Sequence, residues 1–429
     1  MKLKTIKTIL ATGMLSLSLA GLANAQGQGG VTYAYITGST AFRNSVFNVI
    51  ATNTFDSTPT YVGYGNSALS KCNYMIFSNT IGSVPYIIKC QWSGSEAGIL
   101  DCASNILETF PGDGVLGTAG SFTAITSPST PPAPIDSHQN DVGMADNSQS
   151  YSRTLKPSLT GTTVGVIPFT WIKNAQAPAD LTGTLGTDWT NWVNLTQAQV
   201  DTAILDNGTP LSIFTGNAAE TNFVYVAGRN NNSGTRANQL LDIALPVGQF
   251  VSQIYITGGS KTDHTVAITL ENQSNLGINS SGKTYLGTDG QDSGGTLATT
   301  MNYLGSASQT DLNYPYGNTN ACLGWFAVAY LGRSDANSVL GANGNVVEML
   351  FNGVASTSAN IESGVYPCWG NEWIYKAKND SGNSTAQTTL YNVIVNHIVA
   401  NMDGSTAIPY SSMHVYKQSS ASAPVENGF

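Results

Sequence analysis

Apolar runs of strand length alternate along this chain with polar, glycine-containing loops, and several of these loops lead into a helical pattern. The run at 223–226 enters such a loop, after which the sequence becomes helical in character at 237–241. The same order of strand, loop and helix is indicated at 36–43 and at 92–99. Near the end of the chain, apolar residues three and four apart at 388–398 predict an amphipathic helix.

The first residues of the chain predict a secretory signal peptide. Three lysines precede the apolar run at 9–22, which the small residues of 23–25 follow. This run is too short for a stable membrane anchor, and no later run is long enough to cross a bilayer. We therefore expect cleavage after Ala25, which makes 1–25 the signal peptide, and a protein without membrane spans in the periplasm or outside the cell.

The charge balance limits the expected partners. The formal net charge is -9, and only 10% of the residues are charged, against about 25% in ordinary soluble domains. Nucleic acid is excluded as an expected partner because the chain would repel it. Any anion site must create its positive potential locally. A surface that is polar through hydroxyl and amide groups also allows self-association.

The loop after the run at 223–226 has the residues of an oxyanion site. Ser233, Gly234 and Thr235 stand at the start of a predicted helix, where backbone N–H groups and the helix dipole attract an anion. Arg229 adds a planar guanidinium that can hold two oxygens at once. A Ser-Gly-Thr cluster after a strand is also compatible with an ordinary capped helix start.

Three further loops have a similar construction and follow a fixed order with this one. The four are Gly-Ser-Thr-Ala at 38–41, Gly-Ser-Glu-Ala-Gly-Ile at 94–99, a short strand that ends in Asp146, and Arg-x-x-x-Ser-Gly-Thr at 229–235. In this order they resemble the loops of the phosphate-binding proteins of bacterial ABC transporters, which belong to the periplasmic type II solute-binding protein family. Segments at 213–216, 324–330 and 361–367 extend the resemblance.

The resemblance implies an α/β fold of two discontinuous lobes joined by a two-strand hinge, with the ligand bound between them. Lobe one would comprise 26–163 with 332–429, and lobe two would comprise 164–331. The protein would not be an enzyme and would need no metal or other cofactor; it would capture inorganic phosphate, for uptake through an ABC permease. The ligand-binding residues carried over from the family are Ser39, Thr40, Ser95, Asp146, Arg229, Ser233, Gly234 and Thr235.

The acids of these loops bear on the identity of the ligand. An ionised Asp146 only accepts hydrogen bonds, so it favours hydrogen phosphate, which still carries a proton, over sulfate; the alternative is that Asp146 caps the turn at 147–152. Glu96 stands where the family has glycine, and its carboxylate would repel phosphate unless it points away or pairs with Arg229. The alternative function is therefore a transport-inactive exported structural or surface-interaction protein built on the same fold.

The five cysteines show no Cys-x-x-Cys spacing, which argues against a metal or redox motif. In an oxidising compartment an odd count allows two disulfides and one thiol. The pairing with the shortest reach places one bridge among Cys72, Cys90 and Cys102 and another between Cys322 and Cys368, and other pairings stay open.

The segment Gly-Gln-Asp-Ser-Gly-Gly at 290–295 resembles the nucleophile loop of trypsin-like serine proteases. A nucleophilic serine needs a histidine base within reach, and no histidine of the chain stands in the corresponding motif. We interpret the segment as a glycine-rich loop before a helix at 296–303.

Overall fold

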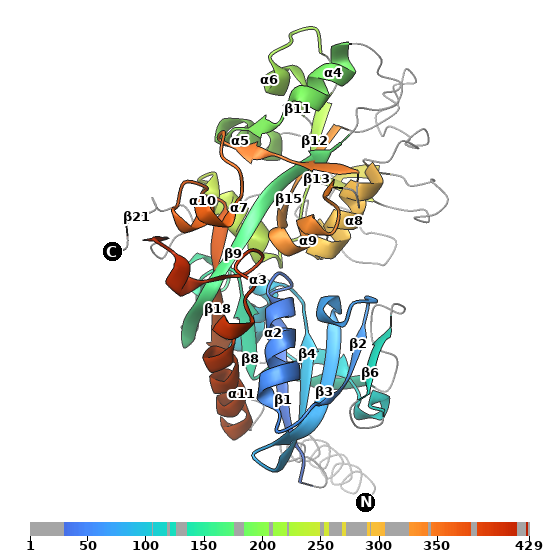
Figure 1. Cartoon of the computed structure of the whole chain (residues 1–429), viewed down its shortest axis with the longest axis vertical. Helices are drawn as coiled ribbons and strands as arrows, with labels where there is room; N and C mark the ends of the chain where they lie inside the picture. Colours follow the sequence, from blue (N-terminus) through green and yellow to red (C-terminus); the bar gives the residue numbers. More distant parts are fainter. Residues whose placement is uncertain are drawn as a thin grey trace, which may run out of the picture.

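The computed structural model of the chain is an elongated molecule of two lobes, one above the other in the view of Figure 1. One large sheet passes through both lobes, and helices cover its faces. The structure describes residues 30–104, 106–117, 121–125, 135–175, 184–205, 209–220, 223–248, 253–256, 268–271, 290–291, 293–304, 326–341, 345–378, 384–417 and 426–427. The expected signal peptide at 1–25 lies outside this part of the chain.

The first lobe, the lower one in Figure 1, is built on a mixed sheet with β1 near its centre. Its strands are β1 (Thr32–Gly38), β2 (Thr60–Tyr64), β3 (Tyr74–Ile81), β4 (Val84–Gln91), β6 (Phe122–Ile125), β8 (Val142–Ala145), β18 (Trp369–Lys376) and β19 (Ile408–Pro409), with β5 (Glu108–Pro111) and β7 (Ile135–His138) as a separate pair. β1 pairs in parallel with both β4 and β8. The loops that follow these three strands therefore meet at one edge of the sheet.

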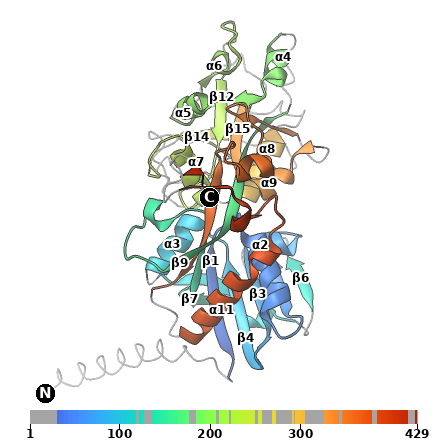
Figure 2. The same ribbon diagram turned by 60° about the vertical axis from the view of Figure 1, so that its left-hand side comes forward.

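Helices lie on both faces of this sheet. The longer ones are α2 (Arg43–Val49), α3 (Ser95–Ala103) and α11 (Ser384–His397), and the short ones are η2 (Ile50–Thr54), η3 (Leu69–Lys71), η4 (Asp113–Val115), η5 (Gln149–Tyr151), η8 (Val399–Asn401) and η9 (Tyr410–Ser412). α11 buries Ala386, Leu390 and Ile394 at four-residue spacing against the core that α2 also joins, which confirms the predicted amphipathic helix. Figure 2 shows α11 lying across the strands of this lobe.

β9 (Gly161–Asn174) joins the two lobes, and Figure 1 shows it running from the lower lobe into the upper one. Its first half pairs with β18, and its second half pairs with β15 (Phe326–Gly332). Pro168 stands where the partner changes. Because proline has no N–H, the ladder passes from one partner to the other there without leaving an unpaired donor.

The second lobe continues the same sheet with parallel strands β12 (Phe223–Ala227) and β15. Its remaining strands are β10 (Asn194–Leu195), β11 (Thr209–Pro210), β13 (Gln253–Ile256), β14 (Ile268–Glu271), β16 (Val346–Glu348) and β17 (Leu350–Phe351). Near the C-terminus, β20 (Val415–Tyr416) pairs with β21 (Glu426–Asn427). Its helices are α4 (Thr184–Asn191), α5 (Gln197–Leu205), α6 (Ser212–Thr215), α7 (Gly234–Asp242), α8 (Gly294–Leu304), α9 (Arg333–Asn337) and α10 (Ser358–Glu362). Apolar residues of α5 and α7 join the core that extends into the first lobe, whereas those of α8 and α9 form a second core cluster.

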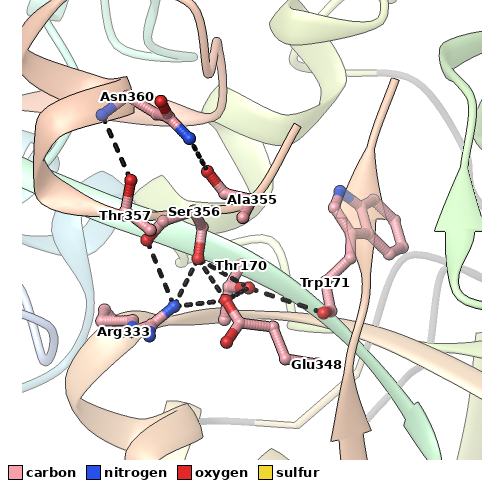
Figure 3. A network of polar contacts seen from close by, with 8 residues as sticks. All are labelled: Thr170, Trp171, Arg333, Glu348, Ala355, Ser356, Thr357 and Asn360. Carbon is pink, nitrogen blue, oxygen red and sulfur yellow. Dashed lines mark hydrogen bonds and ion pairs between the residues drawn. The ribbon is translucent and has the colours of Figure 1, made fainter. Parts of the chain in front are cut away.

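A polar network ties β9 to the segments that follow β15 (Figure 3). The Glu348 carboxylate pairs with Arg333 and accepts a hydrogen bond from Thr170 of β9 at 2.9 Å. Ser356 joins the network by donating to Thr170 at 3.1 Å. Asn360 lies beside it and holds the next turn through the Ala355 carbonyl at 2.9 Å. The network therefore fixes α9, β16 and the chain before α10 against the joining strand.

The cysteines correct one expectation. Cys72, Cys90, Cys102 and Cys368 are buried free thiols, so no bridge forms among the first three, and Cys322 lies outside the described residues. Cys102 is kept from the other two by its position, because Cys72 and Cys90 belong to one core cluster and Cys102 to another. Burial raises the pKa of the Cys72 thiol, as expected for a cysteine that acts as a small apolar residue.

Within the described ranges, none of the helices combines the length and apolar character that a membrane crossing requires. The segment at 290–295 does lead into a helix, since α8 starts at Gly294.

Candidate anion-binding site

Asp146 follows β8 directly, and its carboxylate lies where the two lobes touch. From the first lobe, the Ser95 hydroxyl donates to the Asp146 carboxylate and accepts the Asp146 N–H at 3.1 Å. From the second lobe, the Thr235 hydroxyl donates to the other carboxylate oxygen at 3.1 Å. Asp146 is almost fully buried, so these donors take the place of water around it.

The N-terminus of α7 packs closely on this carboxylate. Ser233 is the N-cap, and its side chain accepts the Arg236 N–H at 3.2 Å. A Cβ at Gly234 would lie 1.7 Å from an Asp146 carboxylate oxygen and 2.6 Å from the Ser95 hydroxyl oxygen. Only glycine therefore allows the helix start to come this close. Asn238, one turn further on, donates to the Asp146 carbonyl at 2.6 Å.

Arg229 lies in the loop between β12 and α7 and is buried. Its Nη2 lies 3.4 Å from the Thr40 hydroxyl, which belongs to the loop after β1 in the first lobe. Its Nε donates to the Gln291 carbonyl at 3.2 Å. The guanidinium is therefore oriented by its own lobe and reaches across to the other.

Ser39 is held by its own loop and by β8. Its N–H donates to the Met144 carbonyl at 2.8 Å, and its hydroxyl accepts the Phe42 N–H at 3.3 Å. Gly38 before it has a φ of +121°, and a Cβ there would lie 2.0 Å from the Met144 carbonyl oxygen. The glycine therefore lets the loops after β1 and β8 run side by side.

Glu96 does not lie against Arg229. It belongs to the first turn of α3, and its carboxylate accepts hydrogen bonds from the Asn147 side chain at 2.6 Å and from the Arg153 N–H at 2.8 Å. The Arg153 side chain also pairs with it, at 3.5 Å between Nε and Oε2. The charge of the acid is therefore compensated by Arg153, and the pairing with Arg229 that the sequence left open is not formed.

The electrostatics of the site depend on burial. Burial raises the pKa of Asp146, and hydrogen bonds from Ser95 and the charge of Arg229 oppose this rise. A second acid, Glu372 of β18, is fully buried beside it. Burial and the neighbouring Asp146 raise the pKa of Glu372 well above its usual value, while the Ser39 hydroxyl opposes the rise.

The sequence-predicted residues thus form two connected groups. Ser95, Asp146, Gly234 and Thr235 are in direct contact, and Thr40 meets Arg229. Ser39 and Ser233 serve their own helix starts. The turn at 147–152 is capped by Ser148, not by Asp146. Sequence reasoning missed Glu372, for which the available signal was a lone acid between the aromatic residues of a buried strand.

The described part of the chain contains no cluster of three or more histidine, cysteine or acidic residues arranged to hold a metal ion. The groups gathered at the site are hydroxyl donors, the N-terminus of α7, one guanidinium and two carboxyl groups. Such a set suits a small oxyanion that carries a proton, because donors meet its bare oxygens and a carboxylate meets its O–H.

No protein-family model and no curated protein matches this chain. Among solved structures, the chain is similar to a Clostridium perfringens protein described as a phosphate ABC transporter substrate-binding protein with bound phosphate, at 13% identity and a TM-score of 0.44, over 86% of this chain and 97% of that one. An ABC-type phosphate transport receptor from Vibrio cholerae matches at 14% identity and a TM-score of 0.40, over 85% and 98% of the two chains. Because both TM-scores are low, these likenesses carry no argument about function.

Proposed function

We propose that this protein is an exported solute-binding protein that captures inorganic phosphate, as hydrogen phosphate, between its two lobes. The observation that carries the proposal is the meeting of Ser95 and Thr235, from opposite lobes, on the carboxylate of Asp146. A site assembled from two lobes can close around a ligand and release it when the lobes separate.

The main attractive elements come from the second lobe. The N-terminus of α7 presents backbone N–H groups at Gly234 and Thr235, where the helix dipole favours an anion. Arg229 adds a buried charge with a geometry suited to two phosphate oxygens. The attraction from these local elements exceeds the repulsion from the negative charge of the whole chain. The reason is that solvent and salt screen the distant surface acids much more than they screen a buried charge.

Asp146 gives the site its preference for phosphate. Sulfate carries no proton at neutral pH, so its oxygens would meet an acceptor without a hydrogen bond between them. Hydrogen phosphate donates its O–H to the same carboxylate. The affinities for the two anions therefore differ, because Asp146 makes a favourable contact with hydrogen phosphate and a repulsive one with sulfate.

The wider assignment belongs to the same proposal. The mature chain would begin after Ala25 and deliver phosphate to an ABC permease without catalysing a reaction. Of the expected lobes, 26–163 with 332–429 and 164–331, the second would extend beyond 331, because α9 and β16 pack with α8 and β9. Pairing of Glu96 with Arg153 removes the repulsion that favoured a transport-inactive protein.

Isothermal titration calorimetry on residues 26–429, with phosphate and with sulfate, tests the proposal. We expect phosphate to bind and sulfate to bind far more weakly. Arg229→Ala should weaken phosphate binding by about 1.5 to 3 kcal/mol, the range for a charge-assisted hydrogen bond. Lys156→Ala is the matched control, because it removes one exposed positive charge and should leave the Kd unchanged.

Phosphate binding that is as tight in Arg229→Ala as in the wild type would contradict the site. No phosphate binding by the wild-type protein would contradict the function.

A further inference from the structure

Glu372 lies beside the candidate site and has no role in the contacts described so far. In the pairing of β18 with β8, Trp373 stands opposite Ala145, so Glu372 is the cross-strand neighbour of Asp146. Its side chain is fully buried. Within the described part of the chain, neither of its carboxyl oxygens has a hydrogen-bond partner.

The backbone around Glu372 is irregular in a way that singles this residue out. Its other neighbour is β9, and the register between β18 and β9 shifts between Glu372 and Trp373. Such bulges re-aim a side chain and are frequent next to functional sites. A strand that packed only for stability would hold an apolar side chain at this buried position.

Two adjacent buried carboxyl groups do not both ionise at neutral pH, because each charge opposes the other. Asp146 receives hydroxyl donors from Ser95 and Thr235, which stabilise its charged form. Among the described residues, Glu372 has only the Ser39 hydroxyl near it, and neither of its carboxyl oxygens receives a hydrogen bond. Its charged form is therefore the less stabilised of the two, so the proton of the pair resides on Glu372. A neutral carboxylic acid is a hydrogen-bond donor, and this donor is unused in the described structure.

The other charged groups around β18 do not change this assignment. The segment of β9 opposite Glu372 carries no charged residue. The charged side chains of the packed helices α3 and α7 face other groups. Glu96 pairs with Arg153, Arg236 donates to the Arg229 carbonyl, Asp242 pairs with Lys417, and Asp101 lies beside Glu108 and Thr37.

We propose that Glu372 is a further ligand-binding residue, a neutral acid that donates a hydrogen bond to an oxygen of the bound phosphate while Asp146 accepts one. This inference rests on the proposed function, and it assigns the two acids opposite roles. Asp146 accepts a hydrogen bond from the O–H group of the ligand, whereas Glu372 donates one to a ligand oxygen that carries no proton. A bare oxygen is common to phosphate and sulfate, so Glu372 adds affinity and leaves the selection between them to Asp146.

The test compares Glu372→Leu and Glu372→Gln with the wild type by calorimetry and by thermal unfolding without ligand. Glu362→Gln is the matched control, a change of the same kind at a partly exposed acid of α10. We expect Glu372→Leu to raise the melting temperature, because it removes an unpartnered buried polar group, and to weaken phosphate binding at least about tenfold. Glu372→Gln keeps a donor and should bind within about threefold of the wild type.

A Glu372→Leu protein that binds phosphate as tightly as the wild type would overturn the inference and leave the proposed function standing. Absence of phosphate binding by the wild type would overturn both.

Infrared difference spectra of the phosphate-free and phosphate-bound protein give a second readout, which does not require Glu372→Leu to fold. The carbonyl stretching band of a protonated carboxyl group should shift when phosphate binds to the wild type, and this band should be missing from Glu372→Gln. A band that phosphate does not shift would contradict contact between Glu372 and the ligand.

Discussion

At the scale of single residues, the site is organised around carboxyl groups, although it is suited to an anion. Asp146 is surrounded by donors from both lobes, so its charge is compensated before any ligand arrives. Glu96, also buried, is compensated by Arg153 and Asn147. Both buried acids are therefore held by their own hydrogen-bond partners, and such partners stabilise the charged form of a buried acid.

Asp146→Asn tests the role of the carboxylate as an acceptor. The amide can donate as well as accept, so sulfate should gain affinity relative to phosphate by about tenfold. Calorimetry with both anions gives this ratio. A ratio equal to that of the wild type would mean that Asp146 does not contact the ligand's proton.

At the scale of elements, β9 depends on the network of Figure 3 to hold its second half against α9 and β16. Arg333 and Glu348 are only partly exposed, at 22% and 30% of their side chains. Loss of one partner therefore leaves a poorly solvated charge.

Arg333→Met removes the cation and keeps the apolar stem. It should lower the free energy of unfolding by about 1 to 3 kcal/mol, since Glu348 and Ser356 lose a charged donor. Urea unfolding measures the change, and phosphate affinity should stay within about threefold because the network is not part of the site. An unchanged midpoint of unfolding would show that the network adds no stability.

The start of α7 gives a second prediction at this scale. Gly234→Ala places a Cβ 1.7 Å from the Asp146 carboxylate, and since the two residues belong to different lobes, the strain is relieved when the lobes move apart. We expect a larger radius of gyration by small-angle X-ray scattering and weaker phosphate binding. Gly295→Ala in α8 is the control, because a Cβ there would lie 3.7 Å from its nearest neighbour. An unaltered radius of gyration together with unaltered binding would contradict the close contact.

At the scale of the whole molecule, buried acids determine how stability depends on pH. Burial raises the pKa of Asp242 to about 6, and burial also raises the pKa of Glu372. The folded state therefore binds more protons than the unfolded state between the ordinary pKa of these acids and their folded values, and stability falls as the pH rises through that window.

Thermal unfolding at about pH 5 and about pH 7.5 tests this dependence. The melting temperature should be higher at the lower pH, and Glu372→Gln should reduce the difference, because one of the contributing acids is removed. At still lower pH, stability falls as the pH is lowered. Hydrogen bonds lower the pKa values of Asp56 and Asp403, so the stability that these acids contribute is lost as the pH falls through those values. A wild-type melting temperature that is higher at the higher of the two pH values would contradict the prediction.

The sequence alone determined the local units of this protein. The strands before the loops, the start of α7 with its Ser233 cap, and the amphipathic face of α11 all follow from residues within a few positions of one another. Apolar spacing and capping act through covalent neighbours, so they can be read from the chain. The candidate residues Ser95, Asp146 and Thr235 were named through the resemblance of their loops to those of phosphate-binding proteins, and each stands at the end of such a unit.

Only the tertiary structure decided which of these units meet. The pairing of Glu96 with Arg153, the free thiols of Cys90 and Cys102, and the place of Glu372 beside Asp146 all depend on sheet order and register. Strand order is set by packing between segments that are far apart in the chain, and no local pattern carries it. The place of the second acid beside Asp146 therefore follows from the pairing of β18 with β8, whereas the sequence shows only a lone acid among the aromatic residues of one strand.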